Sequence, residues 1–168
     1  IAGTLNMADL AIYTASAAAE QTPLLRAAAL LLLTVFALKA AVLPLHLWLP
    51  ALYSAGIAPV AALFAIMTKV GVYAILRTFT LILPVTGPGA DVAAVLPVVA
   101  LLTLAAGALG ALAARRLTVL IAYLVVVSVG TMLAGISLFT VPGLTAALFY
   151  LPHTTLITAG LFLLAALI

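Results

Sequence analysis

Five long runs of apolar residues, separated by short turn-like segments, dominate this sequence and limit what it can fold into. Each run has about 20 residues or more, the length that an α-helix needs to cross the hydrocarbon core of a bilayer. Charged residues make up 5% of the chain and hydrophobic residues 68%, whereas a soluble domain carries roughly 25% charged residues. No soluble fold hides this much apolar surface. The runs therefore predict an all-α, polytopic membrane helix bundle.

We expect five membrane-spanning segments, which together form one transmembrane domain over residues 24–168. The segments are predicted at about 24–53, 60–83, 92–114, 117–138 and 144–168. The more polar residues 1–23 are expected to form an extramembrane loop, with an interfacial helix near 7–19 where apolar residues recur at helical spacing. A spanning helix normally ends in an interfacial anchor or a charge, and the last run ends without one. We therefore interpret the chain as a fragment of a larger membrane protein.

The first span is predicted to be broken between Pro44 and Pro50. It is about 30 residues long, which is too long for one straight crossing. Proline removes a helical hydrogen bond and clashes with the preceding turn, so we expect the first half to end near Leu43. Backbone groups freed at membrane depth persist only where protein or a water-filled cavity satisfies them. Broken helices recur at transporter ion sites for this reason.

Lys39 lies inside the first apolar run, just before the predicted break. A charge at the centre of a spanning helix costs about 2.5–3.5 kcal/mol even on the mildest insertion scale, and such residues usually face a bundle interior or an aqueous path. The alternative is a snorkelling lysine whose ammonium reaches the interface. That alternative suits helix ends, whereas here a further apolar stretch follows as far as Tyr53. We expect a functional role, the uptake and release of a proton.

Lys69 lies near the middle of the second span. The alternative to a functional role is a structural ion pair inside the bundle. The acidic residues of the sequence are Asp9, Glu20 and Asp91, all in or beside predicted loops, and none is expected to reach the midplane. A partner carboxylate must therefore come from chain outside this sequence, or the lysine is held neutral.

Other polar side chains within the spans are candidates for a proton path. They are His46 in the broken region, His153 beside Pro152, the stripe of Tyr150, Thr154 and Thr158, and the pair Ser128 and Thr131. Histidine titrates near neutrality and suits a proton relay. The alternative for a lone histidine is that it only fills a packing position. His46 is the weaker candidate, because the nearby Trp48 suggests an interfacial position, where a histidine costs little. The alternative for the hydroxyls is that they only form hydrogen bonds between helices.

Other kinds of chemistry have no support in the sequence. The lack of cysteine excludes disulfides, thiolate metal sites and cysteine nucleophiles. There is no phosphate-cradling loop, no zinc-ligand spacing and no basic patch with interleaved aromatic residues, so we expect no cofactor, no metal and no nucleic-acid partner. The adjacent pair Arg115 and Arg116 in a short loop favours that side of the membrane as cytoplasmic.

The run LKAAVLPLHLWLPALYSAGIAPVAALFAIMTKVGVYAILR resembles the core of the antiporter-like subunits shared by respiratory complex I and the Mrp cation/proton antiporters. The shared pattern consists of Lys39, Pro44, the run 48–50, the run 59–63 and the run 69–73. The stretches RRLTVLIAYLVVVSVG and FYLPHTTLITAGLFLLA also resemble this family, so the resemblance extends from about Gly3 to the end. Within the family, the chain is most similar to the D-type subunits of Mrp (Mnh or Pha) monovalent cation/proton antiporters.

The resemblance implies a transporter subunit, not an enzyme, that moves protons through buried lysines coupled to Na⁺ or K⁺ efflux. Its implied partners are membrane lipid and other subunits of the complex, and its implied location is the bacterial inner membrane. The chain would hold the seventh to eleventh of about fourteen helices. Lys39 would match the family's lysine on the broken seventh helix and Lys69 the lysine on the eighth. The partner glutamate, on the fifth helix, would lie outside this sequence.

The resemblance also suggests how the last span takes part. His153 falls near the family's histidine on the eleventh helix, and Thr158 stands near a position where some complex I relatives carry a lysine. Two alternatives remain open: a proton-pumping subunit of complex I or of a membrane hydrogenase, and a non-transporting membrane scaffold in which the lysines only fix helix packing.

Overall fold

The computed structural model describes residues 3–4, 6–16, 22–83 and 89–167, and in this part every regular element is helical. The elements are α1 (Met7–Ser16), α2 (Thr22–Ala40), α3 (Trp48–Ala55), α4 (Ala58–Arg77), its π-helical continuation η2 (Thr78–Ile82), α5 (Ala90–Ala113), α6 (Leu117–Ser137) and α7 (Val141–Ala165). Five of the helical segments, with α4 and η2 taken together, are long and apolar enough to cross a membrane. The prediction of an all-α membrane bundle with about five spans is confirmed.

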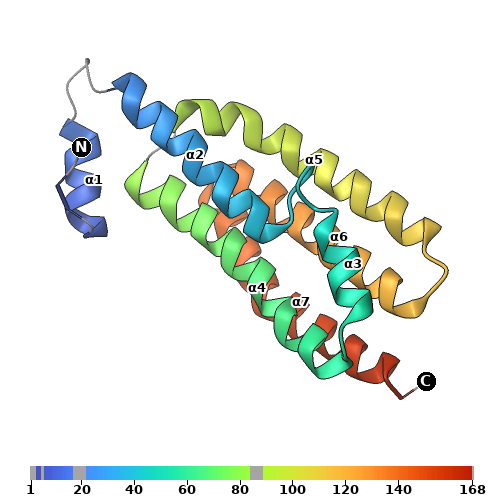
Figure 1. Ribbon diagram of the computed structural model, residues 1–168. Helices are drawn as coiled ribbons and strands as arrows, with labels where there is room; N and C mark the ends of the chain where they lie inside the picture. The colour runs from blue at the N-terminus through green and yellow to red at the C-terminus, as the bar shows by residue number, and fades with distance from the viewer. Residues whose placement is uncertain (1–2, 5, 17–21, 84–88, 168) are drawn as a thin grey trace.

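α6 is the central helix of the bundle. It packs against α5, α7, α3 and α4, and these helices run alongside it in Figure 1. Its buried residues point in several directions around the helix and include Ile121, Val125, Val126, Val129, Met132, Leu133 and Ile136. A helix that is apolar on all sides must be covered by protein or by lipid on all sides. α6 is covered mostly by protein, and this places Ser128 in the interior.

α5 and α6 are in close contact because glycines lie at their crossing. A Cβ atom on Gly107 would lie 2.8 Å from the backbone nitrogen of Val127, and one on Gly130 would lie 2.6 Å from that of Leu104. Small residues let the backbones of membrane helices approach in this way, which replaces the hydrophobic driving force that lipid does not provide.

The outer faces of the helices expose large apolar side chains. Leu112 is 85% exposed, and Val141 and Phe149 are each 79% exposed. In water such surfaces would favour aggregation, whereas the acyl chains of a bilayer solvate them. The exposed faces are therefore the ones that contact lipid or other membrane helices.

The first predicted span is broken, as expected, and the break begins earlier than Pro44. α2 ends at Ala40 because Ala41 adopts a left-handed conformation (φ 57°). The N–H groups of Ala41 and Val42 donate to the carbonyls of Leu38 (3.2 Å) and Ala37 (2.9 Å), a pattern that closes a helix C-terminus. The helix thus ends three residues before the predicted position, through backbone conformation and not through proline.

The two prolines have different places in this region. Pro44 lies in the irregular segment 41–47 that joins α2 to α3, and the Leu43–Pro44 peptide bond is cis. Pro50 lies in the first turn of α3, where a residue without an N–H group breaks no helical hydrogen bond. Only Pro44 therefore belongs to the irregular segment itself.

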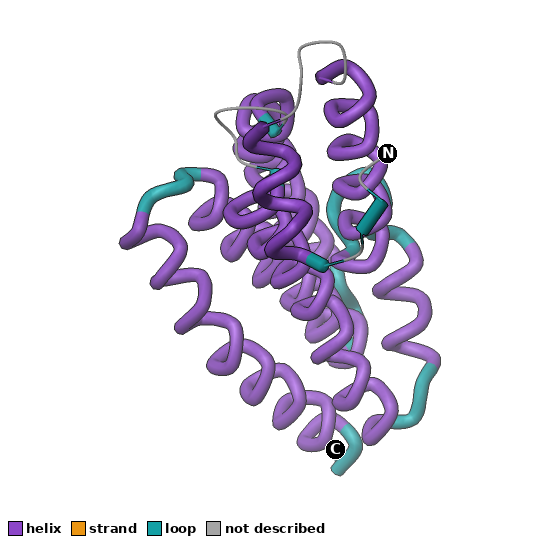
Figure 2. The backbone as a smooth tube through the Cα atoms, turned by 90° about the vertical axis from the view of Figure 1, so that its left-hand side faces the viewer, coloured by secondary structure: helices purple, strands orange, loops and turns teal. Residues whose placement is uncertain are grey.

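α1 lies outside the bundle, beside the end where α2 begins and α4 finishes (Figures 1 and 2). Its Thr14 hydroxyl donates to the carbonyl of Ile82, at the end of η2, across 2.5 Å. Its first turn is capped by Asn6, whose side-chain oxygen accepts the N–H of Ala8 at 3.0 Å. The helix expected over 7–19 is described from Met7 to Ser16, and 17–19 lie outside the described residues.

Candidate functional site

Lys69 is buried at the centre of the bundle. It lies on α4, only 1% of its surface is exposed, and its Nζ atom donates a hydrogen bond to Ser128 Oγ on α6 at 2.9 Å. Ser128 is also buried, at 3% exposed, and its own hydroxyl donates to the carbonyl of Val125 at 2.7 Å. The two residues thus form a short polar chain between α4 and α6, which pack against each other.

No carboxylate within the described residues pairs with Lys69. The described acidic residues are Asp9, which is exposed and accepts a hydrogen bond from Thr4 at 3.3 Å, and Asp91, which lies 3.9 Å from Arg26. The third acid, Glu20, lies outside the described residues. A charged group held in an apolar region without a counter-ion is costly, and such groups concentrate along ion pathways in membrane proteins.

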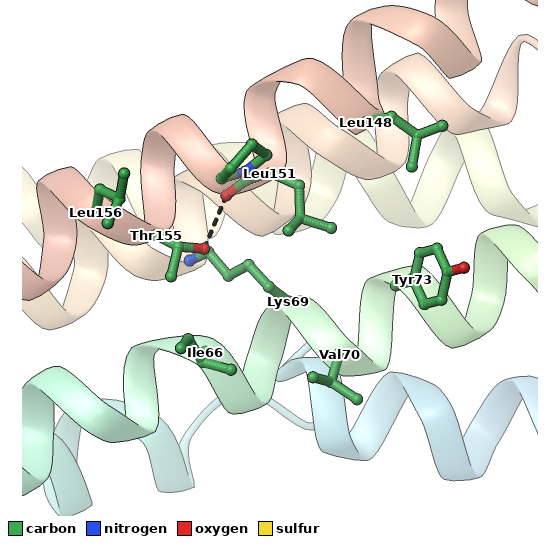
Figure 3. A pocket seen from close by; sticks show the side chains of 9 residues that line it. Ile66, Lys69, Val70, Tyr73, Leu148, Leu151, Thr155 and Leu156 are labelled. Atoms are coloured by element: carbon green, nitrogen blue, oxygen red, sulfur yellow. Dashed lines mark hydrogen bonds between the residues drawn. The ribbon is translucent and has the colours of Figure 1, made fainter.

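A cavity of about 510 Å³ lies between α4 and α7, with Lys69 in its wall. Figure 3 shows the Lys69 side chain reaching from α4 toward α7, with Thr155 facing it from the opposite side. The remaining lining comes from α4 (Ile66, Val70 and Tyr73) and from α7 (Leu148, Leu151, Pro152 and Leu156). Lys69 and Thr155 therefore lie in opposite walls of one cavity.

The inner face of α7 carries three buried threonines. Thr154, Thr155 and Thr158 are all buried, and the hydroxyls of Thr155 and Thr158 donate to carbonyls of their own helix at 2.7 Å. The sequence pointed to Thr154 and Thr158 but missed Thr155. Its place next to Thr154 was the available signal, but adjacency does not tell which side of α7 faces Lys69.

Lys39 occupies a different environment from Lys69. It lies in the last turn of α2 and its side chain is exposed. A positive charge in the last turn is favourable next to the helix C-terminus. The end of α2 nevertheless packs against the middle of α4, because Gly71 allows close approach: a Cβ atom there would lie 2.8 Å from the Ala40 nitrogen. The backbone segments that carry the two lysines are thus in close contact. The side chain of Lys69 is buried and that of Lys39 is exposed.

The two histidines differ in burial. His46 lies in the irregular segment 41–47, is 9% exposed, and its Nδ1 atom has no hydrogen-bond partner among the described residues. His153 is exposed on α7, with its ring 6.1 Å from that of Tyr150. His46 was the histidine expected nearer the interface, because Trp48 follows it. The structure buries His46 within the protein and exposes His153.

The remaining polar candidates divide between the interior and the surface. Ser128 is buried against Lys69, whereas Thr131 is exposed and its hydroxyl donates to the carbonyl of Val127 at 3.0 Å. The described residues contain no group of three His, Cys, Asp or Glu side chains that could hold a metal ion. The described site is therefore made of a lysine, hydroxyl groups and a cavity, and this set can hold, pass or release a proton.

The fold and the site together define a class of protein. Five apolar helices of membrane-spanning length, one broken segment beside a lysine and a second lysine buried at mid-helix are features of multi-pass ion-translocating membrane proteins.

Comparisons with known proteins name the family. The model described as "NADH:quinone oxidoreductase/Mrp antiporter, TM" matches residues 1–168, and the chain belongs to this family. It is 41% identical over 166 residues to the D-type subunit of the Na(+)/H(+) antiporter of Alkalihalophilus pseudofirmus, and 36% identical over 169 residues to the N-type subunit of the NADH-quinone oxidoreductase of Desulforudis audaxviator. These alignments cover 98% and 97% of this chain. They cover 33% and 32% of the two relatives, so the chain spans about a third of their length.

A solved structure is similar over nearly the whole chain. It is the structure of the Mrp complex from Dietzia sp. DQ12-45-1b, with a TM-score of 0.83 and 35% sequence identity. The match covers 96% of this chain and 29% of that one. The similarity to an antiporter-like membrane protein, expected from the sequence, is confirmed.

Proposed function

We propose that this chain forms part of a proton-translocating subunit, of the D type, in a multisubunit Na⁺(K⁺)/H⁺ antiporter. The observation that carries the proposal is Lys69: a buried amine at mid-helix, bonded to Ser128 and lying in the wall of a cavity of about 510 Å³. The relatives named as D-type subunits of Na(+)/H(+) antiporters support the assignment to an antiporter.

The proposed path begins at Lys39 and passes through Lys69. Lys39, at the break, pairs with an acidic residue that this sequence does not contain. When that pair separates, Lys39 gives up its proton and Lys69 receives it. Ser128 accepts a hydrogen bond from Lys69 and orients the amine, whose side chain adjoins the cavity.

The path then continues along α7. Thr155 lines the cavity, and Thr154 and Thr158 are buried on the same helix. His153 is the proposed exit group, because its exposed ring can exchange protons with a neighbouring helix or with water. His46, buried in the break, is proposed as a side branch near Lys39.

A neighbouring protein of the proposed complex couples this proton flow to Na⁺ or K⁺ efflux, and the complex lies in the bacterial inner membrane among its lipids. Arg115 and Arg116, in the loop between α5 and α6, would face the cytoplasm. Residues 1–23 would lie outside the membrane and 24–168 would belong to a single transmembrane domain.

The test is antiport by the complete complex in inside-out membrane vesicles, followed with a dye that reports the pH gradient. Lys39→Ala and Lys69→Ala are each expected to abolish cation-driven proton movement, because each removes a carrier. Arg116→Ala, which removes a cation from an exposed loop, is the control and is expected to retain exchange. The proposal is wrong if both lysine variants exchange protons and cations at the wild-type rate.

A second candidate is a proton-pumping subunit of complex I or of a membrane hydrogenase, and the similarity to the N-type subunit of an NADH-quinone oxidoreductase supports it. Purification of the native complex separates the two, since other antiporter proteins would accompany the chain in one case and a redox module in the other. A non-transporting scaffold is the weaker alternative, and Lys→Gln or Lys→Met variants that assemble and transport normally would support it.

A further inference from the structure

We propose that Thr103 of α5 is the positioning residue of the helix break and holds the segment 41–47 in the geometry that presents Lys39. This inference rests on the proposed function in one respect, because its effect on transport requires that Lys39 carry protons. Its effect on the break itself does not.

The contact joins two parts of the chain that are 60 residues apart. The N–H of Leu43 donates to Thr103 Oγ1 at 3.0 Å, and the Thr103 hydroxyl donates to the carbonyl of Val99 at 2.7 Å. Thr103 is 0% exposed. Because its hydrogen is used on its own helix, its oxygen lone pair is directed at the break, where it accepts the amide of Leu43.

The amide of Leu43 needs this partner. The other backbone bonds of the break are local: Ala41 to Leu38, Val42 to Ala37 and Leu45 to Val42. An amide left unpaired in the hydrocarbon region costs several kcal/mol. Thr103 is thus a side chain from another helix that satisfies a donor which the end of α2 releases.

Packing holds the start of the segment, where Ala41 and Val42 are 0% and 1% exposed, but it holds the residues that follow less closely, because Pro44 is exposed. A cavity of about 290 Å³ lies beside it, lined by Val42, Leu43, Pro44 and Leu45 on one side and by residues of α2, α4, α5 and α6 on the other. A segment next to open space can shift into it, since no atoms on that side oppose the movement. The hydrogen bond to Thr103 therefore fixes a position that close contacts leave open.

A shift of this segment would move Lys39. Only three residues separate Lys39 from Leu43, and two of them, Ala40 and Ala41, are 0% exposed. Because such closely packed residues have little room to absorb a displacement, we expect a shift at Leu43 to reach Lys39. The sequence alone does not single out Thr103, because the proposed role depends on a break in a different span.

The experiment uses the complete antiporter complex with Thr103→Val, which keeps the shape and removes the acceptor, and Thr103→Ser, which keeps the acceptor. Thr131→Val is the matched control, because its hydroxyl bonds only to a carbonyl of its own helix and is exposed. Hydrogen exchange by mass spectrometry over 41–47 and the pH profile of antiport are measured for each. Thr103→Ala carries the same expectation if the valine variant does not assemble.

Thr103→Val is expected to exchange at least tenfold faster over 41–47, because the Leu43 amide is left without its acceptor. Its antiport rate should fall several-fold with a shifted pH profile, and Thr103→Ser should restore both. Unchanged exchange in Thr103→Val, or equal defects in the serine variant, would overturn the inference. Faster exchange with normal antiport would overturn the link between the break geometry and Lys39 and leave Thr103 only as the residue that holds the break. The role of Lys39 itself is tested separately by Lys39→Ala.

Discussion

Lys69 on α4 and Ser128 on α6 are joined by a hydrogen bond of 2.9 Å, although 59 residues separate them in the chain. Both side chains are buried, and the serine in turn donates to Val125 of its own helix at 2.7 Å. The serine oxygen is therefore an acceptor held in place for the lysine amine, and it orients that amine.

Ser128→Ala is expected to reduce antiport strongly, because the Lys69 amine loses its acceptor on α6 in an apolar surrounding. A hydrogen bond to a charged group contributes about 1.5–3 kcal/mol, so the variant should also unfold at a lower temperature. Antiport in vesicles and the thermal midpoint of the purified complex measure both effects. Ser137→Ala, on the same helix and bonded only to Ala134 at 2.8 Å, is the control. Wild-type transport in Ser128→Ala would contradict the role given to this pair.

Gly71→Ala is expected to impair transport by pushing apart the two segments that carry the lysines. The added Cβ atom would lie 2.8 Å from the backbone nitrogen of Ala40, so the end of α2 or the middle of α4 must move. Overpacking of this kind costs about 1–3 kcal/mol.

Gly160→Ala provides the control for this substitution. A Cβ atom at Gly160 meets nothing within 4 Å. Alanine is also the better helix former, so the control should be as stable as the wild type or slightly more so. If Gly71→Ala matched Gly160→Ala in thermal midpoint and in antiport rate, the close approach of α2 and α4 would have no functional consequence.

The sequence predicted the architecture because membrane length and apolar composition are properties of the chain alone. It also predicted that the first span breaks and that Lys69 lies in the core, since a proline and a charge in an apolar run each require an explanation. It could not predict which face of each helix points inward. α5 and α6 are apolar on nearly all sides, so no polar face reveals their rotation. On α7 the stripe of Tyr150, Thr154 and Thr158 marks only part of the inward face.

That rotation explains what sequence reasoning missed. Thr155 faces Lys69 and Thr131 does not, although both are threonines in apolar helices. Similarly, the burial of His46 follows from the fold of 41–47. This segment begins at the left-handed residue Ala41, where the sequence has no glycine to indicate the turn. The sequence thus indicated which kinds of side chain matter, whereas the contacts of each side chain depend on how the helices pack.

Thr155→Val is expected to lower the antiport rate several-fold without affecting assembly. Valine fills the same space, so the packing of α7 is kept, but the cavity loses a hydroxyl opposite Lys69 (Figure 3). Thr145→Val is the control, because Thr145 is an exposed threonine of α7 whose hydroxyl donates to Val141 at 2.8 Å. Antiport in vesicles, normalised to the amount of assembled complex, gives the comparison. Equal rates in the two variants would exclude a proton path through this wall of the cavity.

Ala41→Gly is expected to leave stability unchanged or to raise it, although alanine-to-glycine changes in helices are normally costly. Ala41 has a φ of 57°, a conformation that costs an L-residue roughly 1–2 kcal/mol and that glycine adopts freely. The loss of its buried methyl group offsets about 0.8 kcal/mol of this gain. The control is Ala105→Gly, at an exposed position inside α5, which should destabilise by about 1 kcal/mol. The thermal midpoint of the Ala41→Gly complex should therefore equal or exceed that of the wild type, whereas the midpoint of the Ala105→Gly complex should be lower. A midpoint for Ala41→Gly as low as that for Ala105→Gly would mean that the left-handed residue does not end α2 in the assembled protein.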